Sequence, residues 1–62
     1  MNEDLNYVII QSNEEVLRFT DGDIVIYGSL EDAIYDALPD DKIITLGKYA
    51  KSINVNWEEL VK

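Results

Sequence analysis

Hydrophobic residues cluster in three short segments in the first half of the chain. Residues 5–11, 16–20 and 23–27 are rich in Val, Ile, Phe and Tyr, and short polar segments separate them, which is a pattern typical of β-strands. The dipeptide Asp21-Gly22 joins the last two segments and favours a two-residue type I′ hairpin loop, because Gly accepts positive φ freely and Asp tolerates it. The sequence therefore predicts a three-stranded antiparallel β-meander.

The predicted hairpin assigns its side chains to two faces. A two-residue loop pairs Phe19 with Ile24, and the alternation of side chains follows from this register. One face is then wholly apolar and consists of Leu17, Phe19, Ile24 and Ile26. The other face mixes polar residues with three apolar ones, Val16, Val25 and Tyr27. Because these three need cover, we expect either the C-terminal segment or, by slight preference, a second copy of the chain in a homodimer to pack on them.

A helix is expected shortly after the hairpin. Ser29 precedes Asp32 by three residues, which is the capping-box spacing of a helix N-terminus, and Pro39 should end the helix. Five apolar residues form one stripe with helical spacing, namely Leu30, Ala33, Ile34, Ala37 and Leu38. We expect this stripe to cover the apolar face of the sheet.

The opposite face of this helix is acidic. Together with the turn that follows, it presents Glu31, Asp32, Tyr35, Asp36, Asp40 and Asp41. A helical face of this composition is either simply solvated or a binding surface for a basic protein partner. We assign these six residues as the candidate partner-binding site.

The last third of the chain admits two interpretations. In the first, a helix follows the potential cap Thr45, residues 54–56 form a turn, and Asn56 caps a short final helix. The apolar residues of these two helices would be Leu46, Tyr49, Ala50, Ile53, Trp57, Leu60 and Val61. In the second, residues 43–46 and 51–57 pair as another hairpin, because apolar and polar residues alternate from Lys51 to Trp57. We favour the helical interpretation because it uses both caps.

The composition limits the kinds of catalytic and metal sites that the chain can form. The chain has 62 residues, with 13 Asp plus Glu, 5 Lys plus Arg, and a formal net charge of −8. Residues 1–41 carry eleven acidic residues and one base, Arg18, a net of −10. The chain has no His and no Cys, which excludes Cys/His zinc sites, thiol chemistry and Ser–His nucleophilic pairs. A paired-carboxylate hydrolase would need a cleft that 62 residues can hardly enclose, and neither Asp21-Gly22-Asp23 nor Asp40-Asp41 fits a calcium-binding loop. We therefore expect no catalytic residue, no metal and no cofactor.

These features together indicate one small acidic α+β domain spanning residues 1–62. The longest apolar runs, such as residues 24–27, are far shorter than the roughly 20 residues of a membrane span. We therefore expect no membrane contact and a cytoplasmic location. The expected fold is the β-meander with the helix packed on one face and a short helical, or alternatively β, C-terminal segment.

In its helical form the C-terminal segment resembles the helix-turn-helix of small repressors and excisionases. Ala50 lies in the first helix, Val55 in the turn, and Leu60 closes the pair. The resemblance implies a regulatory protein of the antitoxin or excisionase type. The segment departs from that family at Glu58 and Glu59, because an element that faces phosphates is neutral or basic. We therefore expect no direct nucleic-acid binding.

The favoured functional hypothesis is a non-enzymatic protein-binding module. A small body with a charge of −8 is attracted to cationic clefts and repelled by DNA. This suits a phage or mobile-element inhibitor, for example an anti-defence protein, that occupies the groove of a nucleic-acid-binding host protein. The alternative is the regulatory protein, whose C-terminal segment would bind a toxin or contact DNA weakly.

Overall fold

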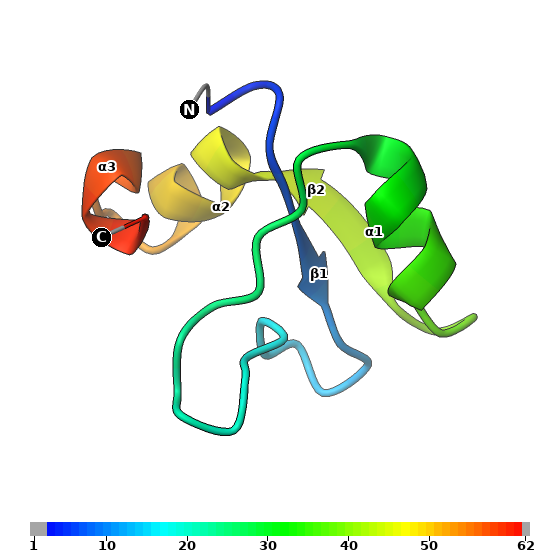
Figure 1. Cartoon of the computed structure of the whole chain (residues 1–62). Coiled ribbons are helices and arrows are strands. Elements are labelled where there is room, and N and C mark those ends of the chain that lie inside the picture. The colour runs from blue at the N-terminus through cyan, green and yellow to red at the C-terminus, as the bar shows by residue number, and fades with distance from the viewer. Residues whose placement is uncertain (1–2, 62) are drawn as a thin grey trace.

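A computed structural model describes residues 3–61 of the chain. It is a small α+β structure in which a two-stranded antiparallel sheet is combined with three helices (Figure 1). The elements in chain order are β1 (Tyr7–Ile10), α1 (Leu30–Asp36), β2 (Lys42–Thr45), α2 (Leu46–Ser52) and α3 (Trp57–Leu60).

The two strands place apolar side chains on both faces of the sheet. Val8 pairs with Ile44, and Ile9 pairs with Ile43. Because successive side chains of a strand point to opposite faces, these two pairs lie on opposite sides of the sheet. Val8 and Ile9 are both 0% exposed, so each face of β1 is covered by another part of the chain.

The C-terminal helices cover the first face. Val8 belongs there to a buried cluster with Val16, Leu46 and Tyr49. Partly buried side chains complete this cluster, and they are Ile10, Ile24, Ile26, Ile44, Trp57, Leu60 and Val61. The largest core of the protein therefore lies between the sheet and the α2–α3 pair.

Helix α1 covers the second face. Among the described elements it contacts both strands but neither of the other helices, and it lies across the sheet from them (Figure 1). Its buried residue is Ala33, which is 0% exposed. A four-residue strand thus lies at the centre of three layers.

The predicted three-stranded meander is wrong. Residues 16–20 and 23–27 form no continuous strands; they are held by isolated bridges that pair Ile10 with Val16, Arg18 with Ile24, and Tyr27 with Tyr7. One edge of β1 therefore pairs with β2 over four residues. The other edge has only isolated bridges, one at each end of the strand. In Figure 1 the chain between these bridges runs away from the sheet as a long loop and then returns to it.

The hairpin register differs from the predicted one by one residue. The loop has three residues, 20–22, because the Phe19 amide donates to the Asp23 carbonyl over 2.8 Å and the Gly22 amide donates to the Phe19 carbonyl over 3.0 Å. Only Gly22 has a positive φ, of 97°, which is the pattern of a type I turn followed by a bulge. The type I′ turn is therefore wrong, and Arg18 pairs with Ile24.

This shift rearranges both predicted faces. Val16, Ile24 and Ile26 all contribute to the core beneath α2 and α3. Phe19, which was expected to be covered, is 57% exposed. The physical reason is the extra loop residue, because a slip of one position turns every following side chain to the other face.

A second loop, residues 12–14, has the same construction. The Glu14 amide donates to the Gln11 carbonyl over 2.8 Å, and the Gln11 amide donates to the Glu15 carbonyl over 2.9 Å. In both loops an Asx side chain accepts from the amide two residues later: Asn13 from Glu15 over 3.0 Å, and Asp21 from Asp23 over 3.1 Å. Glu14, with a φ of 69°, occupies the place that Gly22 has in the other loop.

The C-terminal segment is helical, and the alternative hairpin is wrong. Thr45 caps α2 by accepting from the Lys48 amide over 3.2 Å. Helix α2 ends in a Schellman motif at Asn54, which has a φ of 59°. The Asn54 amide donates to the Lys51 carbonyl over 3.1 Å, and the Val55 amide donates to the Ala50 carbonyl over 3.0 Å.

We expect Gly22→Ala to lower the free energy of unfolding by about 1 kcal/mol. A Cβ at Gly22 would meet no atom within 4 Å, so the effect comes from the positive φ alone. Gly28→Ala is the matched control, because a Cβ there also meets nothing within 4 Å and Gly28 has no positive φ. Chemical denaturation measures both variants, and equal stabilities would contradict the observed turn.

Glu14→Gly should stabilise the protein by roughly 0.5–1 kcal/mol, since Gly adopts a positive φ without the strain that a side chain adds. Glu15→Gly, one residue away and without a positive φ, should destabilise the protein. The same denaturation experiment compares the two variants. A Glu14→Gly variant no more stable than wild type would mean that the second loop is not strained.

Candidate functional site

Helix α1 and the turn after it carry the predicted partner-binding residues. Ser29 begins the helix, and its hydroxyl accepts from the Asp32 amide over 3.2 Å. The helix ends where Ala37, the C-cap, becomes extended and its amide donates to the Ala33 carbonyl. Residues 29–41 contain five carboxylates and no base, so this side of the protein is strongly negative.

Tyr35 and four of the five predicted carboxylates are exposed, and the fourth carboxylate is Asp36. Glu31, Asp32 and Asp40 are all exposed, and Tyr35 is 89% exposed. These four side chains are available to a partner without any rearrangement of the fold.

The other two carboxylates stabilise the protein itself. Asp36 accepts a hydrogen bond from the Tyr27 hydroxyl over 2.9 Å. Asp41 accepts from the Leu38 amide over 2.9 Å, and its own amide donates to the Leu38 carbonyl over 2.9 Å. Asp41 therefore closes the turn that follows α1. Asp36 links α1 to Tyr27, which lies at the end of the long loop that precedes the helix.

The apolar stripe of α1 does not cover the sheet as predicted. Ala33 is fully buried, but Leu30, Ile34 and Leu38 are 46%, 57% and 68% exposed. Small alanine side chains let a helix approach a sheet closely, which leaves the longer side chains beside the contact. We call Leu30, Ile34 and Leu38 the apolar ridge. Sequence reasoning assigned them to the core and so missed them as surface residues.

The three predicted self-association residues do not form one surface. Val16 is only 7% exposed and belongs to the core cluster. Tyr27 is partly buried and points its hydroxyl to Asp36 on α1, and Val25 is also partly buried. The premise of a shared face rested on the wrong hairpin register. Val16 packs in the core with Tyr49 of α2, and the homodimer stays a prediction.

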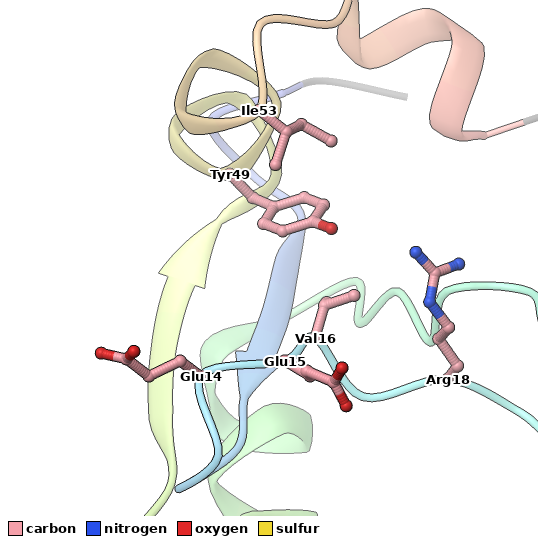
Figure 2. Close-up of a pocket in the computed structure, with 6 residues that line it drawn as sticks. All are labelled: Glu14, Glu15, Val16, Arg18, Tyr49 and Ile53. Atoms are coloured by element: carbon pink, nitrogen blue, oxygen red, sulfur yellow. The ribbon is translucent and has the colours of Figure 1, made fainter.

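A shallow depression of about 440 Å³ lies between α2 and the first loop. Figure 2 shows the Tyr49 hydroxyl pointing into the space beside Glu15 and Arg18, while Glu14 is directed away. Arg18 is already engaged there, because its guanidinium donates to the Gly22 carbonyl over 2.9 Å. The depression is open to solvent, and its lining includes one basic and two acidic residues. Ligand sites are usually concave and mostly apolar, so this depression is better explained as a gap between two packed segments.

Comparisons with known proteins add no relative. No protein-family model, curated protein or solved structure matches the chain. Across residues 3–61 there is no group of three or more carboxylates that could hold a metal ion. No helix in the same range is long and apolar enough to cross a membrane. Inference about function therefore depends on the α1 surface itself.

The hydrogen bond between Tyr27 and Asp36 changes the pKa of the tyrosine. Burial, together with the hydrogen bond to Asp36 and its negative charge, raises the pKa of Tyr27 to about 12 from an ordinary value of 10.0. The fold therefore favours the protonated hydroxyl. Its contribution to stability is complete below pH 10 and is lost as the pH rises through about 12.

We expect wild-type stability to fall between pH 10 and 12, and Tyr27→Phe to show a shallower decline over the same interval. The measurement is the free energy of unfolding as a function of pH. Tyr35→Phe is the matched control, because it removes a hydroxyl that is exposed to solvent. Identical alkaline profiles for wild type and Tyr27→Phe would show that the bond to Asp36 does not stabilise the fold.

Proposed function

We propose that the protein is a non-enzymatic binding module whose acidic α1 surface engages a basic protein partner. The observation that carries this proposal is the exposure of Glu31, Asp32 and Asp40 in a segment that contains no base. Exposed charges contribute little to folding stability but strongly affect the rate of association. These carboxylates are therefore better suited to recognition than to support of the fold.

The proposal extends to the kind of partner. Proteins that bind nucleic acids present cationic clefts, and a chain with a net charge of −8 is attracted to such clefts and repelled by DNA. An inhibitor of a nucleic-acid-binding host protein, carried by a phage or a mobile element, fits this chemistry. Such a host protein would be met in the cytoplasm, which is where the proposal places the chain.

The C-terminal helix pair gives less support to a DNA-binding regulator. The α2–turn–α3 arrangement has the order of a helix-turn-helix, but α3 covers only Trp57–Leu60. Glu58 and Glu59 are exposed in its first turn, where they would repel phosphates. The helices instead contribute Leu46, Tyr49 and Trp57 to the core.

Neutralising the exposed carboxylates should abolish partner binding without unfolding the protein. The variant is Glu31→Gln/Asp32→Asn/Asp40→Asn, which leaves Asp36 and Asp41 in their internal hydrogen bonds. Immobilised wild-type protein is expected to retain a basic host protein that salt elutes, and the variant should lose it while keeping a wild-type melting curve.

The control removes acidic charge from another surface. Glu58→Gln/Glu59→Gln neutralises exposed carboxylates of α3 and should retain the same host protein. Neither protein should bind a DNA column at low salt. Equal loss of the partner in both variants would show that binding depends on net charge and not on the α1 surface. Full binding by the α1 variant would show that the partner does not bind at the α1 surface.

A further inference from the structure

The apolar ridge of α1 is not explained by the fold. Leu30 and Ile34 lie one turn apart on α1, and Leu38 follows just beyond the C-cap. All three are about half exposed or more, although neighbouring Ala33 is fully buried. Leu30 and Ile34 are neighbours at i and i+4 on α1, and exposed apolar side chains that lie together on a small soluble protein mark an interaction surface more often than scattered ones do.

Exposed carboxylates lie close to these residues along the chain. Glu31 directly follows Leu30 in the first turn of α1, and Asp40 lies two residues beyond Leu38. Both are exposed. A partner that covers the ridge must therefore bury apolar side chains and, beside them, present positive charge.

We propose that the ridge formed by Leu30, Ile34 and Leu38 docks a cationic amphipathic helix of a protein partner. This inference rests on the proposed function and specifies its ligand: basic side chains meet Glu31 and Asp40, and apolar side chains of the same helix pack on the ridge. A helix that presents apolar residues at i, i+3, i+4 and i+7, with Lys or Arg beside them, has this combination of groups. The ridge supplies the part of the affinity that salt does not screen.

A second copy of the chain fits the ridge less well. A symmetric dimer on this face would bring the two α1 segments together, each with five carboxylates and no base between residues 29 and 41. Two chains of −8 each would be held at short range without a compensating cation. Charge complementarity therefore favours a cationic helix over self-association.

The test uses the full chain and a synthetic probe. The probe is a peptide of roughly 18 Leu and Lys residues, long enough to be helical, with Leu on one helical face; a scrambled isomer has the same charge and no such face. Fluorescence anisotropy measures the affinity of each peptide, and amide chemical shifts locate the binding surface. We expect the amphipathic peptide to bind at least about tenfold more tightly than its isomer and to shift amides of residues 30–38.

Ridge variants separate apolar docking from charge attraction. Ile34→Ser/Leu38→Ser should lose about tenfold in affinity for the amphipathic peptide and bind the scrambled isomer as wild type does. Leu5→Ser is the matched control, since Leu5 is 62% exposed and lies outside α1. This control should bind both peptides normally. Melting curves confirm that all variants fold.

Each contrary outcome has a separate meaning. Equal binding of the two peptides, with carboxylate dependence preserved, would overturn the ridge inference and leave the proposed function standing. Absence of binding by either peptide at low salt would count against both. Concentration-dependent shifts of residues 30–38 in the free protein, with a sedimentation mass near twice 7.1 kDa, would assign the ridge to a second copy and overturn the inference.

Discussion

The fold depends on one short strand that is buried on both faces. Val8 and Ile9 of β1 are adjacent in sequence, point to opposite sides, and are both fully buried. On one side Val8 joins the core beneath α2 and α3; on the other side Ile9 lies beneath α1. Because a chain of 62 residues can bury little apolar surface in a single core, the use of both faces of β1 lets one strand stabilise two layers at once. Its neighbours need not form long strands themselves.

How much of this fold the sequence predicts depends on how local each signal is. Ser29, Thr45 and Asn56 cap helices by contacts within three residues, and all three helices were predicted from those caps. The hairpin register is different, because Asp21-Gly22 fits both a two-residue loop with two positive φ values and a three-residue loop with one. The choice is decided by which side chains reach the core, and that depends on helices some twenty or more residues later in the chain. The pairing of β1 with β2 was missed for the same reason, because the two strands lie far apart in the sequence.

The candidate site shows the same division. The position of the carboxylates on the outer side of α1 follows from helical periodicity, and Glu31, Asp32 and Tyr35 are exposed as predicted. Periodicity could not show that Asp36 accepts a hydrogen bond from Tyr27, which lies nine residues away and comes near it only in the folded chain. Asp41 bonds to Leu38 within a local turn, but this turn lies beyond the helix and helical periodicity does not describe it. The sequence did contain one signal for the ridge. Small Ala residues alternating with large apolar residues along a helix indicate that the alanines mark the line of closest contact and the larger side chains lie beside it.

Acidity and the apolar ridge are therefore two parts of one surface. Exposed Leu and Ile side chains on a small protein promote non-specific association, and a net charge of −8 opposes it by repulsion between copies. The same repulsion acts on other acidic molecules, and the proposed partner would relieve it by supplying positive charge to the exposed carboxylates Glu31 and Asp40. In the proposed complex, charge would set the rate of association and apolar contact with Ile34 and Leu38 the rate of dissociation, because association rates respond mainly to charge and dissociation rates to buried contacts. The proposed docking therefore requires a partner that combines positive charge with an apolar face.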